Sequence, residues 1–192
     1  MTKVELKQAA KRREIIESAI PIISAGNFDE ISVSDICKAT GISVGTFYHY
    51  FTAKNDLLVG LFALVDAHIS DNVKPLLVPG NEPENLFLFA KGWAEHVAAN
   101  GIARSRLISA IEPADTDAFG EKREAVKILE EIMRKGQEKK QITLAHSPEE
   151  LTRMFLLAMR GVTVDWSRHN GQYDAVAAME EFMSLFINGL KP

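Results

Sequence analysis

Cysteine, long apolar runs and strand-like alternation are scarce in this sequence of 192 residues. Cys37 is the only cysteine, which excludes a disulfide framework and a cysteine-based zinc cluster. No apolar run approaches the roughly 18 residues of a membrane span, and the first residues lack the apolar core of a signal peptide. No stretch alternates apolar and polar residues between turns as a strand does. These absences predict an all-α, cytoplasmic protein with no membrane segment and no cofactor.

Sequence patterns typical of catalysis are also missing. The five histidines show no metal-ligand spacing. The chain has no nucleophile elbow, no phosphate-binding glycine loop and no HExxH motif. The adjacent glutamates at 130–131 and 180–181 point to different sides of a helix and are more typical of solvated surfaces. We therefore expect that the chain is not an enzyme.

The net charge of −4 is unevenly distributed along the chain. Of 22 basic and 26 acidic residues, seven of each lie in residues 1–60, which leaves 15 basic and 19 acidic residues in the remainder. The first thirteen residues contain five basic residues and one acid, Glu5. A basic leading segment can approach phosphates even in an acidic protein. A solvated helix face explains the same pattern equally well.

Apolar residues recur at helical spacing from residue 15 onward. A first helix is predicted by an apolar face, which consists of Ile15, Ile16, Ala19, Ile20 and Ile23. Pro21 removes a backbone donor from that helix and should kink it. Ser32, with Asp35 three residues later, predicts the cap of a second helix over residues 33–40.

The rest of the chain is expected to form a long helix, a connection and a further helical domain. A helix is expected from residue 54 to residue 70, and it is followed by residues 71–84, which contain three prolines and a glycine. We interpret this second segment as the interdomain connection. Four or five further helices follow. Residues 1–53 are therefore expected to form one domain, residues 54–70 a connecting helix and residues 71–192 a second domain.

The segment GISVGTFYHYF, residues 41–51, concentrates aromatic residues just after a turn. A short helix that follows a capped helix and a glycine turn is typical of a helix-turn-helix unit, whose second helix enters the DNA major groove. At 3.6 residues per turn Phe47 and Phe51 share an inward face, with Ile42 beneath them. The opposite face is expected to be exposed and to contact DNA. It consists of Val44, Gly45, Thr46, Tyr48 and His49.

The sequence from residue 15 to residue 58 resembles the N-terminal signature of the TetR family of transcriptional regulators. The resemblance rests on the capped helix at Ser32, the turn at residues 39–43, the run Gly45-Thr46-Phe47-Tyr48, Phe51 and Lys54. Thr40 stands where the family usually has alanine, and Pro21 is unusual for the first helix. The helical remainder also suits the family.

This resemblance implies a homodimer that binds a palindromic double-stranded DNA operator and is released by a small-molecule effector, most often as a repressor. Phosphates would be held by Ser43, Thr46, Tyr48, His49 and Lys54. Val44 and Gly45 would lie nearest the bases. Tyr50 could be another phosphate donor or simply part of the packing.

The resemblance also implies a dimer interface and an effector pocket in the second domain. Interface candidates, for which internal core is the alternative, are Met154, Phe155, Met159, Met179, Phe182, Met183 and Phe186. Pocket candidates, for which plain core is again the alternative, are Phe62, Phe87, Phe89, Trp93, His96, Met133 and Trp166. Possible polar anchors are Arg104, Glu112 and Asp165. Two other functions stay open, namely an activator and a protein of this fold that acts through a protein partner.

Overall fold

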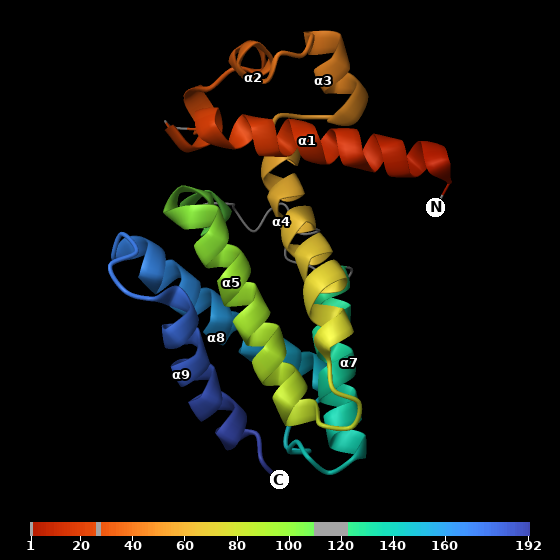
Figure 1. Ribbon diagram of the computed structural model, residues 1–192, viewed down its shortest axis with the longest axis vertical. Coiled ribbons are helices and arrows are strands. Elements are labelled where there is room, and N and C mark those ends of the chain that lie inside the picture. Colours follow the sequence, from red (N-terminus) through yellow and green to blue (C-terminus); the bar gives the residue numbers. More distant parts are fainter. Residues whose placement is uncertain (1, 26–27, 110–122) are drawn as a thin grey trace.

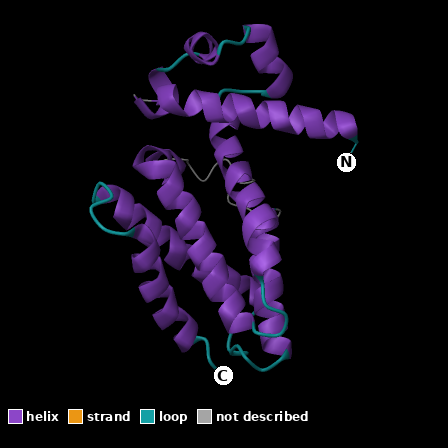
Figure 2. Ribbon diagram, viewed as in Figure 1, coloured by secondary structure: helices purple, strands orange, loops and turns teal. Residues whose placement is uncertain are grey.

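A computed structural model describes residues 2–25, 28–109 and 123–192 of the chain. These residues form helices and turns and contain no strand (Figure 2). The α-helices are α1 (Lys3–Ala25), α2 (Val33–Thr40), α3 (Val44–Tyr50), α4 (Asp56–His68), α5 (Glu82–Ser109), α7 (Glu124–Glu138), α8 (Pro148–Arg168) and α9 (Ala175–Gly189). None of the described helices combines the length and apolarity required to cross a lipid bilayer.

The first three helices form a small head at one end of the molecule. Helix α1 lies across the top of α4, and α2 and α3 sit on its other side (Figure 1). The expected apolar face of α1 is buried: Ile15, Ile16, Ala19 and Ile23 are each at most 2% exposed. They pack with residues of α2 and α3 into one core. Burial of this shared face holds the two short helices α2 and α3 against α1.

Helix α1 runs through Pro21 as far as Ala25. Proline lacks a backbone N–H, so the carbonyl of Glu17 loses its helical donor. Pro21 and Glu17 both lie on the exposed side of α1, where water can replace that hydrogen bond. The expected kink therefore does not end the helix.

Helix α4 leads from the head into a bundle formed with α5, α7, α8 and α9 (Figure 1). It ends at His68 and continues as a π-helical turn over Ile69–Val73 and a 3-10 turn over Lys74–Leu76. The chain then reverses, and α5 runs back beside α4 toward the head.

The interpretation of residues 71–84 as an interdomain connection is wrong. This segment lies at the end of the bundle that is farthest from the head (Figure 1). Val73 is 3% exposed and belongs to the bundle core, and Leu77 packs against that core. The prolines mark the reversal between α4 and α5, while the link between head and bundle is the unbroken helix α4.

Two large hydrophobic cores occupy the described parts of the chain. One lies in the head and includes Leu57 and Leu61 of α4, whereas the other lies in the bundle and includes Val65 and Ile69 of the same helix. Ile108 packs against both. We propose that residues 1–53 form one domain and residues 71–192 another. The connecting helix, residues 54–70, belongs to both, because α4 contributes side chains to both cores.

Candidate functional site

The turn between α2 and α3 is closed by caps at both sides. Ser32 begins α2 with a capping box, in which its hydroxyl and the Asp35 carboxylate each accept from the other residue's backbone N–H. Gly41 ends α2 with φ of 70°, in the left-handed region that favours glycine. Ser43 then caps α3, since its Oγ accepts from the backbone N–H of Thr46 at 3.0 Å. These local contacts fix α3 relative to α2.

The aromatic rings of α3 divide between the two faces as predicted. Phe47 is 0% exposed and Phe51 is 2% exposed, and their ring centroids lie 5.1 Å apart in the head core. Tyr48 is 56% exposed and Val44 is 46% exposed. The Tyr48 ring meets Phe47 edge-on, at a centroid distance of 5.4 Å. The Tyr48 hydroxyl therefore belongs to an exposed side chain whose ring packs on Phe47.

Other residues predicted to bind DNA lie on or beside the same surface. Ser43, Gly45 and His49 are exposed, and Thr46 is half-buried with its Oγ1 2.8 Å from Ser43 Oγ. A Cβ added to Gly45 would meet only Ser43 Oγ, at 3.8 Å. No packing contact inside the described chain therefore requires glycine at position 45.

Tyr50 lies at the edge of this surface. Its side chain is half-buried and packs against the head core, with the His49 ring 4.8 Å away. Of the two roles considered for Tyr50, packing is the one for which the structure provides contacts.

Lys54 occupies a position different from the one expected for a phosphate-binding residue. Its Nζ donates to three backbone carbonyls, those of Phe28 at 2.7 Å, Ile31 at 2.9 Å and Asp29 at 3.1 Å. The ammonium also lies 4.6 Å from the centroid of the Phe28 ring. An ammonium has three N–H donors, so all of them are used inside the head. The sequence could not show this, because the contacting residues lie 23 to 26 positions away. Lys54 thus ties the turn after α1 to the start of α4.

A cavity of about 170 Å³ lies in the bundle between α4, α5 and α8. Four of the predicted residues line it, namely Phe62, Trp93, His96 and the anchor Arg104. Val65, which we also expect to contact a ligand because it follows Phe62 on the same helix, lines the cavity too. The lining residues that the sequence did not indicate are Val97, Asn100, Ser105, Ile108, Arg160, Thr163 and Val164. Most of these are small or polar residues that no aromatic or methionine pattern would have selected.

The remaining pocket candidates lie elsewhere. Phe89 and Met133 are fully buried in the bundle core, and Phe87 is half-buried outside the cavity lining. Trp166 is buried, and its Nε1 donates to the carbonyl of Tyr173 at 2.9 Å. Phe89 and Met133 are therefore core residues, whereas Phe87 and Trp166 belong neither to the cavity lining nor to the bundle core.

Asp165, the other predicted anchor within the described residues, is not part of the cavity lining. Asp165 is exposed and accepts a hydrogen bond from the Tyr173 hydroxyl at 2.7 Å. That carboxylate and burial together raise the pKa of Tyr173 to about 12, burial being the larger cause. Glu112 lies outside the described residues.

The polar wall of the cavity is set by a break in α5 at Gly101, where φ is 78° and ψ is 171°. Only glycine adopts this conformation without strain. The break redirects the last turns of α5 and places Arg104 and Ser105 in the cavity wall. Asn100, just before the break, donates to the carbonyl of His96 at 2.7 Å and accepts from Arg104 Nη1. The glycine and the asparagine therefore position the arginine.

Three basic side chains of the cavity wall, His96, Arg104 and Arg160, have lowered pKa values. Burial, the largest cause, and the nearby charges of Arg104 and His68 together lower the pKa of His96 to about 4. His96 is therefore neutral at pH 7, and its ring lies 4.6 Å from that of His68. Burial also lowers the pKa of Arg104 and of Arg160 from the ordinary arginine value.

A buried ion pair joins α4 to the start of α7 beside the cavity. Arg123 is bidentate to Asp66, with Nε–Oδ2 of 3.1 Å and Nη2–Oδ1 of 2.8 Å. Its guanidinium lies 4.7 Å from the ring centroid of Phe62 and donates to the Phe62 carbonyl at 3.3 Å. Phe62 is thereby held between the cavity and this ion pair.

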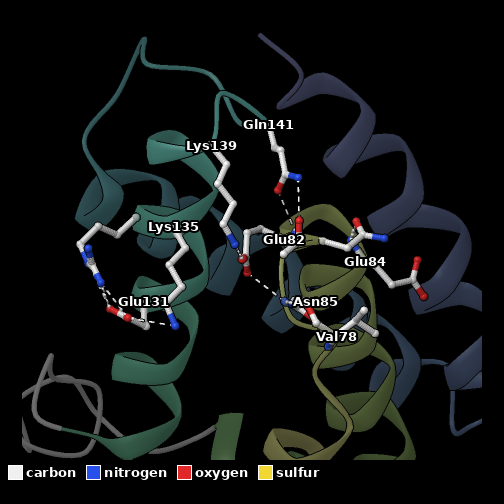
Figure 3. Close-up of polar contacts among 11 residues, drawn as sticks. Val78, Glu82, Glu84, Asn85, Glu131, Lys135, Lys139 and Gln141 are labelled. Carbon is white, nitrogen blue, oxygen red and sulfur yellow. Dashed lines mark hydrogen bonds and ion pairs between the residues drawn. The ribbon is translucent and has the colours of Figure 1, made fainter.

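A second, larger hollow lies near the far end of the bundle, between the α4–α5 reversal and α7. Several of its charged residues pair with one another (Figure 3). Glu82, 2% exposed, accepts from Lys139 at 2.6 Å and from Asn85 at 2.8 Å. Lys135 pairs with Glu131 at 3.2 Å. In these pairs the charges of Lys135 and Lys139 are compensated by carboxylates of the same chain.

The predicted interface residues divide between interior and surface. Phe155, Met159, Met179 and Met183 are at most 1% exposed and belong to the bundle core, so none of them can contribute to a surface. That part of the prediction is wrong, because α8 and α9 must bury one face against α5 and α7. Phe182 is 48% exposed, and Met154 and Phe186 are half-buried.

Residues 15–61 match the family model of the "Bacterial regulatory proteins, tetR family". Over 66 residues the chain is 38% identical to the uncharacterized HTH-type transcriptional regulator YvdT of Bacillus subtilis. Over 52 residues it is 38% identical to the fatty acid metabolism regulator protein of the same organism. The aligned segments span 34% and 27% of those relatives, and the same shares of this chain. Both relatives are named as regulators rather than enzymes.

Two solved structures share the fold over nearly their whole length. The fatty acid degradation regulator FadR from Bacillus halodurans aligns with a TM-score of 0.79 at 21% identity, covering 93% of this chain and 98% of that one. FadR from Bacillus subtilis, solved in complex with stearoyl-CoA, aligns with a TM-score of 0.77 at 20% identity, covering 92% and 98%. The likeness to the tetR family of bacterial regulatory proteins is therefore carried by residues 15–61, and the likeness of the remaining described residues to the two solved structures is one of fold.

Proposed function

We propose that this protein is a transcriptional regulator that binds an operator with the exposed face of α3. The observation that carries the proposal is the division of α3, in which Phe47 and Phe51 anchor the helix while Val44 and Tyr48 face outward. The family match of residues 15–61 supports it. The contacting residues would be Ser43, Val44, Gly45, Thr46, Tyr48 and His49. We leave Lys54 out, because its donors are used inside the head.

Recognition by this surface would depend on contacts other than paired hydrogen bonds to bases. Val44 and Gly45 offer no bidentate side chain for guanine or adenine. Tyr48, His49 and the hydroxyls at 43 and 46 can donate to phosphate oxygens. A thymine methyl contact, bridging water and DNA shape would then supply the sequence preference.

We propose further that the protein acts as a homodimer through α8 and α9. Leu157 is 57% exposed, Phe182 48% and Leu185 71%, and all three lie on these two helices. Twofold symmetry suits a palindromic operator. Two heads would then contact half-sites one or a few turns apart, at about 34–36 Å per turn.

A small molecule in the cavity would act on DNA binding through α4, most simply by releasing a repressor. Phe62 and Val65 of α4 both line the cavity, and the other end of α4 packs against α1 in the head. Ile108 lines the cavity and also packs against the head core. A ligand that shifts occupancy from 1:99 to 99:1 must favour one state by about 5.5 kcal/mol.

The test is a fluorescence-anisotropy titration of the full chain against DNA from upstream of its own gene, at several salt concentrations. A regulator binds one segment with nanomolar affinity, far above scrambled DNA, and with a steep salt dependence. Weak binding without sequence preference in every upstream segment contradicts the proposal.

A further inference from the structure

The cavity contains a buried cation whose hydrogen-bonding groups are only partly used. Arg104 is 5% exposed, and its Nη1 donates to Asn100. Its Nε and Nη2 are buried without a hydrogen-bond partner among the described residues. We propose that the effector is a small organic acid with an apolar body, whose carboxylate is bound by Arg104. This inference rests on the proposed function, since it names the ligand class of the same cavity.

Within the part of the chain that the structure describes, the Arg104 guanidinium has no anionic partner. No carboxylate of the described residues forms an ion pair with Arg104. Among the described residues, Glu17 is the only acid that affects its pKa, and Glu17 is exposed and bonded to Arg13 at 3.0 Å. A buried charge without a partner is strongly unfavourable. A planar carboxylate matches the donor fork of a guanidinium and would supply both missing acceptors.

Two neighbouring groups could complete the binding of the acid. Trp93 Nε1 and His96 Nε2 are also buried without a hydrogen-bond partner in the described parts of the chain, and both residues line the same cavity. The indole N–H is a donor only. Neutral His96 can donate or accept at Nε2, depending on its tautomer. The cavity thus has more free donors than acceptors, as an anion requires.

The size and the walls of the cavity limit the body of the ligand. Phe62, Val65, Val97, Ile108 and Val164 provide apolar walls. The volume of about 170 Å³ lies below the range of about 300–1,000 Å³ for drug-sized ligands. An aromatic or short aliphatic acid fits this description. A coenzyme A thioester would have to place its nucleotide outside the cavity.

The second hollow of the bundle shows the opposite arrangement. There Lys139 pairs with Glu82 and Lys135 with Glu131, so those charges stabilise the fold without a ligand (Figure 3). In the central cavity the charge of Arg104 has no such counter-ion among the described residues. This contrast within one domain points to the central cavity as the anion site.

Isothermal titration calorimetry on the full chain tests the ligand class. The probes are phenylacetate, hexanoate and cyclohexanecarboxylate, each compared with its primary amide, and octanoyl-CoA as a bulky thioester. At least one acid is expected to bind saturably, and its amide about tenfold more weakly or worse. Arg104→Gln should abolish this preference, whereas Arg134→Gln, an exposed arginine on α7, should retain it.

A second measurement separates a binding role from a structural one. Arg104→Gln removes a buried, partly unpaired charge, so its melting temperature should equal or exceed that of the wild type. A clear loss of stability would show that the guanidinium is satisfied inside the fold and would overturn the inference. Equal binding of acids and amides, binding of octanoyl-CoA alone, or no saturable binding of any acid would also overturn it.

Operator binding, measured in parallel by anisotropy, keeps the two proposals apart. If the chain binds its operator but shows no acid preference, the ligand class is wrong and the regulator stands. If acids bind in an Arg104-dependent way but no DNA is preferred, the anion site stands and the regulatory proposal fails.

Discussion

At the scale of single residues, two neighbouring rings on α3 have opposite surroundings. Phe47 fills the head core, whereas Tyr48 rests on it and points its hydroxyl outward. Tyr48→Phe should therefore weaken operator binding and leave the melting temperature unchanged. Phe47→Ala should destabilise the head by about 3–5 kcal/mol, as large-to-small core changes do. Anisotropy and thermal unfolding distinguish the two, and equal stability of both variants would contradict the assignment of faces.

Gly45 allows a test in which stability and affinity change in opposite directions. The structure leaves room for a methyl group at this position, and alanine is favoured over glycine in helices by roughly 1 kcal/mol. Gly45→Ala should stabilise the head by up to that amount. If the backbone of α3 approaches the bases here, the added methyl group should weaken operator binding. Unchanged affinity in anisotropy would show that Gly45 lies away from the DNA.

His96 gives a prediction on pH. Its pKa is about 4 in the folded chain against an ordinary value of 6.5, so the unfolded chain binds more protons between these values. The lowered pKa of His96 does not change the free energy of unfolding above pH 6.5. As the pH falls from 6.5 toward 4, it reduces the free energy of unfolding. The slope is at most about 1.4 kcal/mol per pH unit, for one proton.

Urea unfolding between pH 7 and pH 4 of the wild type and of His96→Gln checks this prediction, because other groups titrate in both proteins alike. The wild type should lose more stability than the variant over the window. Parallel pH profiles would mean that His96 is freely protonated in the fold.

At the scale of elements, the contact between α1 and α4 is set by Gly60. A Cβ at this position would lie 3.1 Å from Ile16 Cγ1 and would overlap Ile16 Cδ1. Ile16 is 2% exposed and packs in the head core, so an added methyl group would compete with it for the same buried space. Gly60→Ala should therefore separate the two helices and destabilise the chain by about 1–3 kcal/mol. Thermal unfolding compares the melting temperature of this variant with that of Gly45→Ala, the same change at an open position. Equal melting temperatures of the two variants would contradict close packing of α1 against α4 at Gly60.

The contact between α1 and α4 also connects the cavity to the head. Helix α4 carries Phe62 and Val65 at the cavity and Gly60 at the head, within six residues. A shift at one end of so short and buried a segment is transmitted to the other, because a packed helix moves as a unit. We therefore expect effector binding in the cavity to shift the α1–α4 contact before it changes the rest of the head.

At the scale of the whole molecule, the exposed apolar residues of α8 and α9 require an explanation. Phe182 and Leu185 lie three positions apart on α9 and share a face. If they form the proposed dimer interface, Leu185→Glu should yield a monomer with a near-wild-type helical fold and much weaker operator binding. Sedimentation measures the mass, and Leu144→Glu, an equally exposed leucine outside these helices, is the control. A dimeric Leu185→Glu variant would place the interface elsewhere.

The sequence by itself determined what depends on near neighbours along the chain. The caps at Ser32 and Ser43, the turn at Gly41 and the inward side of Phe47 and Phe51 all follow from residues within a few positions. A helix repeats every 3.6 residues, so such patterns report which side of an element is buried.

Only the tertiary structure decided which partner each buried side meets. Lys54 meets carbonyls that lie more than twenty positions before it. Phe155 and Phe182 look alike in sequence, yet one is core and the other surface. Arg104 becomes a cavity residue through contacts between α4, α5 and α8. Periodicity identifies a buried face but not the element that covers it, because burial depends on the approach of segments distant in the chain.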